Sequence, residues 1–528
     1  MPPLFAPAAP EALPEYTVVE LIKHSALIAP NGEAVICGEH RINWQTFDLR
    51  VNKVANALIS AGIKKGDRVA ILASTSIEYV EIFMGTLRAG ACIVPLSTMS
   101  TTQALQKMVE DCGAKIFFLS QSMRELVEDF LQSLPSINPG NLIALDFENS
   151  GWENYEEWLS AASDKAPNIE IDYDDLFNII YSSGTTGTPK GILHDHMMRA
   201  NQMARVQEHG YTNETRTLLS TPLYSNTTIV ALLPTLVAGG TVVLMPKFDA
   251  SKYLELVEKE HCTHTMLVPV QYKRIMDVPE FDTFDLSSML MKFSTSAPLR
   301  AALKEDVLKR FPGGLTEYYG LTEGGGTTVL LAHLHPDKLA SVGQPAPDVE
   351  LKFIDDEGTE VAKGKMGEIC GRSPAMMSGY FGRDDLTNET LWQDSEGKTF
   401  FRSGDLGYID EDGFVFLGDR KKDMIISGGL NIYANDLELA LLQDDDVEDA
   451  AVIGVPSEAW GETPFGFIVV RKGATRGESD ILATANNQLG KSQRLSDVKI
   501  VQSLPRSQIG KILKRELRAD YEKTASQQ

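Results

Sequence analysis

Short apolar runs alternate with longer amphipathic stretches through the first two thirds of the chain. An apolar run at Arg68–Ala73 is followed by helical spacing of apolar residues over Ile77–Arg88 and then by another apolar run at Ala91–Leu96. This order of strand, helix and strand is typical of a parallel sheet covered by helices. The other runs of strand length are Lys115–Leu119, Asn141–Asp146, Phe177–Tyr181, Thr241–Met245, Thr265–Val268 and Leu290–Phe293. We therefore predict an α/β fold with largely parallel sheets.

The pattern changes after about residue 340, where short strand-like segments are separated by Gly and Asp turns. These segments are Val349–Ile354, Gly367–Cys370 and Phe414–Leu417. They predict a small strand-rich subdomain over about 340–418, which completes a large N-terminal domain, 1–418. The polar, charged residues 419–423 are interpreted as a hinge. The remaining stretch, 424–528, is long enough for a small, mobile α+β domain.

Net charge, the lengths of the apolar runs and the cysteine spacing disfavour several classes of function. Subtracting 73 acidic from 49 basic residues gives a net charge of −24, which disfavours nonspecific binding to nucleic acid or anionic membranes. No uncharged apolar run approaches the ~18–20 residues that span a bilayer, the start has no signal-peptide pattern, and the five cysteines form no CxxC pair. We expect a cytoplasmic protein without a membrane span or a nucleic-acid partner, and a homodimer is left open. The acidic run Asp444–Asp449 is expected to be a solvated loop.

A loop with the composition of a phosphate site follows the strand Phe177–Tyr181. Its sequence is SSGTTGTPKG, Ser182–Gly191. Three glycines permit unusual backbone angles, and five hydroxyl residues with Lys190 offer donors to an anion. The spacing matches neither the Walker A pattern nor GxGxxG. The loop therefore predicts a polyphosphate site of another kind.

Tyr181–Gly191 closely resembles the signature loop of the adenylate-forming superfamily, which includes acyl-CoA synthetases, luciferases and peptide-synthetase adenylation domains. Further motifs of that family follow in the expected order: Ser294–Leu299 (STSAPL), Tyr319–Glu323 (YGLTE), Ser403–Asp405 with Gly407, Asp419–Glu438, and Pro505–Lys511 (PRSQIGK). Together they span nearly the whole chain. The resemblance implies an enzyme that uses ATP and Mg²⁺ to convert a small carboxylic acid into acyl-AMP and pyrophosphate, and then transfers the acyl group to coenzyme A.

The resemblance also implies which residues bind ATP or AMP. Tyr319 would stack on adenine, Asp405 and Arg420 would hold the ribose, and Glu323 would be the magnesium ligand, because a carboxylate is a hard oxygen ligand. The nucleotide-binding set is Ser182, Ser183, Gly184, Thr185, Thr186, Gly187, Lys190, Ser296, Ala297, Pro298, Glu317, Tyr318, Tyr319, Gly320, Leu321, Thr322, Asp405, Arg420 and Lys511.

Catalysis of the first step is predicted for Lys511, with Thr185 and Glu323. An ammonium between the carboxylate and the α-phosphate would stabilise the charge of the pentacoordinate transition state. By resemblance, the small C-terminal domain then rotates about Lys422 so that a thiol can reach the acyl carbon. The residues that would line the coenzyme A tunnel in the rotated state are Ser427, Gly428 and Gly429.

The acyl site departs from the family pattern. The segment Pro222–Thr228 has Ser225 where many relatives have a histidine, and Thr295 and Tyr318 stand where glycine is common. The added bulk, with Tyr224, predicts a compact hydrophobic acid, either aromatic or of short to medium chain. The residues assigned to the acyl pocket are Tyr224, Ser225, Thr295 and Tyr318.

Alternative functions share these motifs. Luciferases and carrier-loading domains also adenylate, so a carrier protein or another nucleophile stays open as the acceptor. Amino-acid adenylation is disfavoured because no FDxS carboxylate is present, and a silent nucleotide sensor is disfavoured because Lys511 and Glu323 remain. His194 and His196, two residues apart and outside any HExxH motif, are predicted to be structural.

Overall fold

The computed structural model describes residues 15–131, 134, 136–138, 140–182, 189–204, 206, 209–427, 430–458, 460–490, 493–507 and 510–525. The chain divides into two compact units, and each is described by itself. The first unit comprises Met1–Glu350 and Gly371–Phe401, and the second comprises Leu351–Cys370 and Arg402–Gln528. In the described part of the chain, no helix has both the length and the apolar character needed to cross a membrane.

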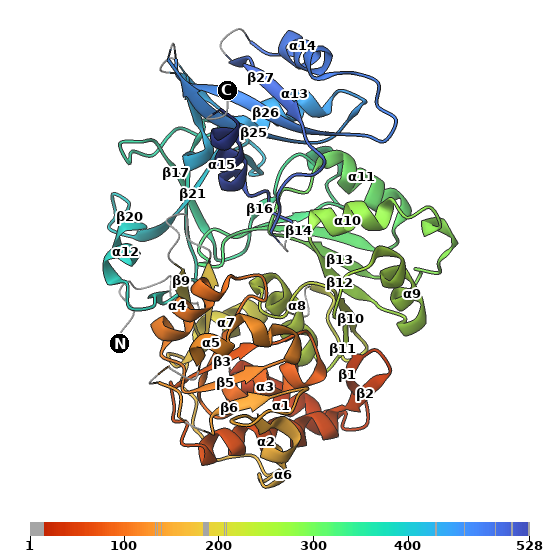
Figure 1. Ribbon diagram of the computed structural model, residues 1–528, viewed down its shortest axis with the longest axis vertical. Helices are drawn as coiled ribbons and strands as arrows, with labels where there is room; N and C mark the ends of the chain where they lie inside the picture. Colours follow the sequence, from red (N-terminus) through yellow and green to blue (C-terminus); the bar gives the residue numbers. More distant parts are fainter. Residues whose placement is uncertain are drawn as a thin grey trace. The chain divides into compact units, whose positions relative to one another are not determined.

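Two mixed sheets form the centre of the first unit, and most of their strands are parallel, as the sequence predicts (Figure 1). One sheet has the order β16 (Gln344–Pro345), β15 (Thr328–Leu331), β14 (Gly314–Tyr319), β13 (Met291–Ser294), β12 (His264–Leu267), β10 (Arg216–Leu219), β11 (Thr241–Leu244), β1 (Glu33–Cys37) and β2 (His40–Asn43). The other has the order β19 (Gly379–Tyr380), β9 (Lys190–Asp195), β8 (Leu176–Ser182), β4 (Cys92–Pro95), β3 (Arg68–Leu72), β5 (Ile116–Leu119), β6 (Leu142–Ala144) and β7 (Glu153–Asn154).

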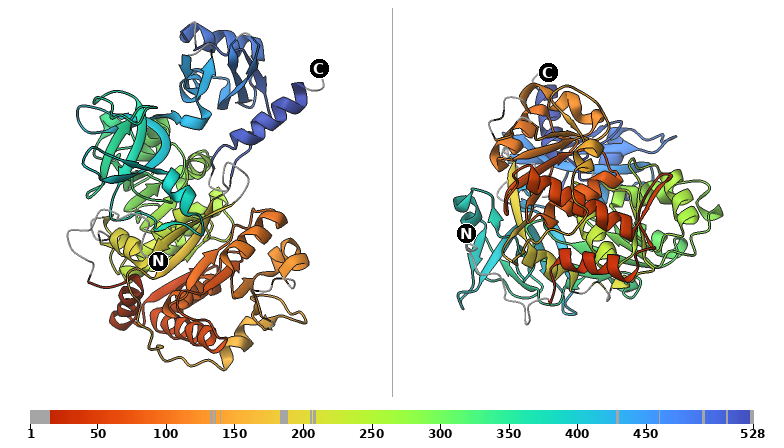
Figure 2. Two further views of the ribbon diagram at one scale, coloured as in Figure 1. Left: turned by 90° about the vertical axis from the view of Figure 1, so that its left-hand side faces the viewer. Right: turned by 90° about the horizontal axis from the view of Figure 1, so that it is seen from below.

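Helices pack on these sheets and bury their apolar faces. They are α1 (Val18–Ile28), α2 (Trp44–Ser60), α3 (Ile77–Arg88), α4 (Thr102–Cys112), α5 (Glu128–Leu131), α6 (Tyr155–Ser160), α7 (His196–Met203), α8 (Asn226–Val237), α9 (Ala250–Glu260), α10 (Pro269–Met276), α11 (Ala301–Arg310) and α12 (Asp384–Glu389). Helices α2 and α3, drawn in red and orange-red, lie side by side (Figure 2). A Cβ at Gly85 of α3 would lie 2.4 Å from the Val54 side chain of α2, so this close approach requires glycine.

Strand register brings the predicted motifs to defined places in the first unit. Strands β8 and β9 are antiparallel, with Ser182 opposite Lys190, so the phosphate-type loop connects the two. Strands β13 and β14 are parallel, with Ser294 opposite Glu317. The STSAPL and YGLTE motifs therefore begin at neighbouring strand ends, which is where ligands bind in open α/β sheets.

The second unit is built on antiparallel strands and a small α+β segment. Its strands are β17 (Glu350–Ile354), β18 (Gly367–Arg372), β21 (Thr399–Ile409) and β22 (Val415–Arg420), in the order β17-β18-β21-β22. The first residues of β21, 399–401, belong to the first unit and pair within it with β20 (Leu391–Gln393). A second sheet contains β24 (Leu430–Ile432), β23 (Ile425–Ser427), β26 (Gly461–Val470), β25 (Val447–Ser457) and β27 (Asp497–Ile500). It packs with α13 (Ala434–Leu442), α14 (Glu478–Gln488) and α15 (Lys514–Ala525).

The acidic run Asp444–Asp449 is not the solvated loop that the sequence predicts. Strand β25 begins at Val447, and Asp444 is only 4% exposed, because it forms an ion pair with Arg476. The hinge assigned to 419–423 and the domain boundaries derived from it stay predictions. In the structure, Lys421–Asp423 form a single 3-10 turn after β22.

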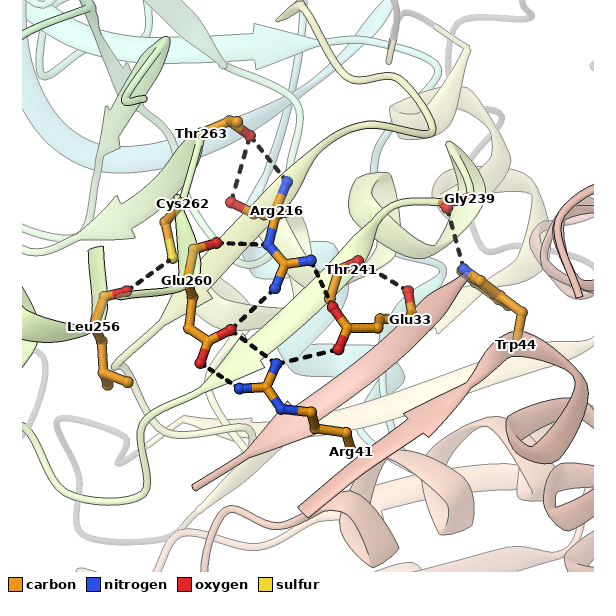
Figure 3. Close-up of polar contacts among 10 residues, drawn as sticks. All are labelled: Glu33, Arg41, Trp44, Arg216, Gly239, Thr241, Leu256, Glu260, Cys262 and Thr263. Atoms are coloured by element: carbon orange, nitrogen blue, oxygen red, sulfur yellow. Dashed lines mark hydrogen bonds and ion pairs between the residues drawn. The ribbon is translucent and has the colours of Figure 1, made fainter. Parts of the chain in front are cut away.

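A four-residue charge network joins distant segments of the first unit (Figure 3). Arg41 of β2 donates to Glu260 at 2.6 and 2.9 Å and to Glu33 at 3.1 Å. Arg216 of β10 donates to the same two carboxylates, at 3.0 Å and 2.8 Å. The side chain of Glu260, at the end of α9, is 3% exposed, so its charge is balanced almost entirely by the two arginines.

Glu260→Gln is expected to lower the free energy of unfolding by about 2 kcal/mol at pH 7, because two charged hydrogen-bonding partners lose a carboxylate. Hydrogen bonds from Arg41 lower the pKa of Glu260. The stability that this carboxylate contributes is therefore present above its ordinary pKa of about 4.3 and is lost as the pH falls through the lowered pKa. Urea unfolding of both proteins should show a difference that shrinks below about pH 4. The matched variant Glu39→Gln, whose side chain is 88% exposed, should unfold like the wild type.

Candidate active site

One tyrosine connects the end of the phosphate-type loop with the YGLTE motif. The Lys190 ammonium lies 5.4 Å from the ring centroid of Tyr380, and the Tyr380 hydroxyl donates to Glu323 Oε1 at 2.9 Å. Burial raises the pKa of Tyr380, so its hydroxyl keeps the proton that it donates. Of the predicted loop residues, Ser183, Gly184, Thr185, Thr186 and Gly187 lie outside the described residues. Lys190 and Glu323 thus both contact Tyr380, Lys190 over the ring and Glu323 at the hydroxyl.

Glu323 is fixed at both ends and still has a carboxylate oxygen to offer. Its backbone carbonyl accepts a hydrogen bond from Met377 N–H at 2.8 Å, and Oε1 accepts one from Tyr380. Within the described part of the chain, Oε2 takes no hydrogen bond or ion pair. The residue is only partly buried. A partly exposed carboxylate with an available oxygen fits a magnesium ligand.

The STSAPL segment is held by a buried ion pair that no sequence pattern predicts. Glu317 Oε1 accepts a hydrogen bond from Leu299 N–H at 3.0 Å, and Oε2 pairs with Lys304, which also donates to two backbone carbonyls. Glu317 and Lys304 are 2% and 1% exposed. The carboxylate of Glu317 is therefore occupied within the protein, so any part that its side chain takes in nucleotide binding is indirect.

Ser296 in the same segment has a strained backbone and a fixed side chain. Its φ is 80°, a region that residues other than glycine seldom adopt. Its hydroxyl lies 2.5 Å from the Thr227 hydroxyl at the start of α8. Such strain is typical of ligand-binding segments. The adjacent Ala297 and Pro298 form the rest of the predicted nucleotide contact, which stays a prediction.

Aromatic rings fix the predicted acyl residue Tyr318. Its ring stacks on Phe293 with a centroid distance of 5.8 Å, and its hydroxyl lies 3.2 Å from His209 Nδ1. Tyr211 stacks on the same phenylalanine at 5.8 Å. Among the other predicted acyl residues, Ser225 is the N-cap of α8, Thr295 follows β13, and Tyr224 is partly buried, which raises the pKa of its hydroxyl. Tyr318 cannot turn aside without breaking this stack.

The adenine-side residues continue from the end of β14. Tyr319 is the last residue of this strand, opposite Thr328 of β15, and Gly320 follows it. Leu321 packs in a small apolar cluster with Ile192 and Tyr380. These contacts hold the YGLTE motif in place, whereas the contacts of Tyr319, Gly320, Leu321 and Thr322 with a nucleotide stay predictions.

In the second unit, the two predicted ribose-binding residues are partners. Asp405 lies opposite Arg420 in the β21–β22 pair, and Arg420 Nε lies 3.0 Å from Asp405 Oδ1. Asp405 is buried, and its backbone N–H donates to Ser403 Oγ at 3.0 Å. The strand pairing thus orients both side chains before any ligand arrives.

Two ion pairs flank the predicted catalytic lysine in the second unit. Arg506 donates to the carbonyl of Gly510 and to Asp449 of β25, each at 2.5 Å. On the other side of Lys511, Lys514 lies 2.9 Å from Glu438, which accepts from Val452 N–H of β25. The loop bearing Lys511 is therefore attached to β25 from both sides.

The remaining predictions in the second unit stay untested. Lys422 lies in the turn after β22 and Ser427 ends β23, whereas Gly428 and Gly429 lie outside the described residues.

Comparisons with known proteins show the family of the chain. The family model "AMP-binding enzyme" matches residues 22–381, and the model of the "AMP-binding enzyme C-terminal domain" matches residues 436–511. A feruloyl-CoA synthase of Amycolatopsis sp is 33% identical over 501 residues, which are 94% of this chain and 97% of that protein. The fatty acid–[acyl-carrier-protein] ligase ScoC of Streptomyces coeruleorubidus is 31% identical over 512 residues, which are 95% and 96% of the two chains.

Solved structures give the same result. ATP-bound MatB from Rhodopseudomonas palustris superposes with a TM-score of 0.86 at 29% identity, covering 96% of this chain and 99% of that one. The predicted α/β architecture, with parallel sheets and a small C-terminal domain, is therefore confirmed. Because the family model spans more than half of the sequence and relatives above 30% identity span nearly all of it, the chain belongs to the AMP-binding enzyme family, as an adenylate-forming ligase of the acyl-CoA synthetase type.

Proposed function

We propose that this chain is an ATP-dependent acyl-CoA synthetase that activates a compact hydrophobic carboxylic acid, aromatic or of short to medium chain. One observation carries the nucleotide half of the proposal: Lys190 and Glu323 lie around Tyr380, with the Tyr380 hydroxyl bonded to Glu323. This puts an ammonium and a carboxylate, a donor to phosphate and a ligand for Mg²⁺, at neighbouring positions.

The chain's own residues have separable roles in this proposal. Lys190 binds phosphate, Glu323 offers its free carboxylate oxygen to magnesium, and the Asp405–Arg420 pair holds the ribose. Magnesium supplies charge neutralisation at the phosphates when it is bound. Lys511 stabilises the charge that develops as the acid's carboxylate attacks the α-phosphate. Lys422 and the segment from Ser427 serve the second half-reaction, in which the thiol of coenzyme A displaces AMP.

The fixed position of Tyr318 supports the substrate class. A phenol ring that is stacked on Phe293 and bonded to His209 does not make room for a long chain. The named relatives act on a feruloyl group and on fatty acids, so similarity alone leaves both classes open.

The test is a release assay with the purified protein over a panel of aryl, short-chain, medium-chain and long-chain acids. Pyrophosphate is measured with MgATP alone, and AMP and thioester are measured after coenzyme A is added. We expect acid-dependent pyrophosphate release with compact acids, followed by a thioester that depends on coenzyme A. Pyrophosphate release without a thioester would instead support a carrier protein or another nucleophile as acceptor. Full activity with long-chain acids and none with compact acids would refute the substrate class.

A further inference from the structure

A buried arginine, hydrogen-bonded to neutral groups among the described residues, lies beside the hairpin that carries the phosphate-type loop. Arg199 of α7 is 0% exposed, and among the described residues it forms no ion pair. Its guanidinium donates to neutral acceptors only: Asn178 Oδ1 at 2.9 and 3.2 Å, Gln202 Oε1 at 2.9 Å, Asn226 Oδ1 at 3.0 Å and His194 Nδ1 at 2.8 Å. Burying a guanidinium that forms no ion pair with a described residue is unfavourable, so this arrangement requires an explanation.

The contact with His194 decides which nitrogen of that ring carries the proton. Arginine only donates hydrogen bonds, so Nδ1 must be the acceptor, and Asn178 Nδ2 also lies 3.0 Å from it. The other nitrogen, Nε2, lies 2.8 Å from the carbonyl oxygen of Thr322, which only accepts. His194 is therefore neutral with its proton on Nε2. Burial and the nearby Arg199 charge both lower its pKa, which agrees with a neutral ring.

This tautomer links Arg199 to the YGLTE motif through two successive hydrogen bonds. The order of donation runs from Arg199 to His194 and from His194 to the carbonyl of Thr322, the residue before Glu323. Arg199 is charged at neutral pH, because burial lowers its pKa only to about 9. It therefore presents a donor to Nδ1 throughout the physiological range, and the Nε2 proton always faces Thr322. A donor that could also accept, such as an amide or a hydroxyl, would not fix the tautomer in this way.

We propose that Arg199 and His194 are positioning residues that hold Thr322, and with it Glu323, for the complex of magnesium and ATP. The proposal rests on the proposed function, since it needs Glu323 to contact that complex. Neither residue touches the ligand. They act as the outer partners of a metal ligand do, by fixing its backbone.

The test compares His194→Leu with His194→Gln. Leucine removes both hydrogen bonds, whereas the glutamine amide can accept from Arg199 and donate to Thr322. Binding of MgATP is measured by isothermal titration calorimetry, and the half-saturating Mg²⁺ concentration is measured by pyrophosphate release. We expect His194→Leu to weaken both about tenfold and His194→Gln to restore most of the loss. Arg199→Met is expected to behave like His194→Leu.

Arg88→Met is the matched control, because Arg88 is also buried and bonded, to Asp48 and Asn52, but lies in α3 away from the YGLTE motif. It should lower the melting temperature and leave MgATP affinity and Mg²⁺ dependence unchanged. Wild-type affinity in His194→Leu, or an equal loss in Arg88→Met, would overturn the proposal. Failure of the proposed function has a different signature: the wild type would release no pyrophosphate with any acid, while the calorimetry would still report on the two positioning residues.

Discussion

Lys511→Ala is expected to slow acyl-AMP formation by about 100- to 1,000-fold, because the variant removes a preorganised positive charge from the transition state. Thioester formation from supplied acyl-adenylate should change by less than about tenfold, since the role proposed for the lysine is in the first step only. The measurement is single-turnover kinetics of each half-reaction, with pyrophosphate and thioester followed separately. The flanking ion pairs of Arg506 and Lys514 are left intact, so the loop should keep its attachment to β25.

The control for this variant is Lys523→Ala. Lys523 lies in α15 of the same unit, and its side chain is 76% exposed. It should retain both half-reactions at the wild-type rate. Equal losses of both half-reactions in Lys511→Ala would contradict the role assigned to this lysine.

Lys304→Met is expected to lower the free energy of unfolding by about 3–5 kcal/mol, because it leaves Glu317 buried without its partner. Burial raises the pKa of Glu317, and Lys304 opposes that shift, so loss of the lysine should favour the protonated acid. The backbone carbonyls of Leu339 and Ser341 lose a donor as well. Urea unfolding at pH 7 measures the loss.

The double variant Lys304→Met with Glu317→Gln provides the decisive comparison. Glutamine keeps an acceptor for Leu299 N–H but carries no charge, so the pair should be less destabilised than Lys304→Met alone. If the double variant unfolds at the sum of the two single losses, the ion pair does not act as a unit. An exposed pair, Lys273 and Asp277, serves as the control, because Lys273→Met should cost less than about 0.5 kcal/mol.

The predicted strands agree well with the structure where a strand is a contiguous apolar run, whereas strands with polar residues, such as β10 (RTLL) and β14 (GLTEYY), are not among the predicted runs. Thr265–Val268 and Leu290–Phe293, for example, are within one residue of β12 and β13. The position of the loop between β8 and β9 could also be predicted, since its glycines and hydroxyls are adjacent in sequence. For the acidic run Asp444–Asp449, the deciding partner of Asp444 is Arg476, which lies 32 residues away and leaves no local signal.

The contacts that organise the candidate site could not be predicted for the same reason. Tyr380 lies 57 residues from Glu323, and His194 lies 128 residues from the carbonyl that it binds. No short pattern marks either pair. The two-residue spacing of His194 and His196 does not reveal that His194 lies in strand β9 while His196 begins α7. The order of the strands in the sheets decides which of these side chains are in contact. Local patterns in a single sequence do not predict that order.

The charge network around Glu260 has a consequence for synthesis of the chain. Arg41 leaves the ribosome 219 residues before Glu260, and β1 has its parallel partner in β11, which also comes late. At about 5–20 residues per second, the N-terminal hairpin waits roughly 10–40 seconds before its partners exist. During that interval its apolar residues and open strand edges are exposed to other nascent chains. The hairpin of β1 and β2 is therefore expected to need protection from association during translation, although it is among the first segments to be made.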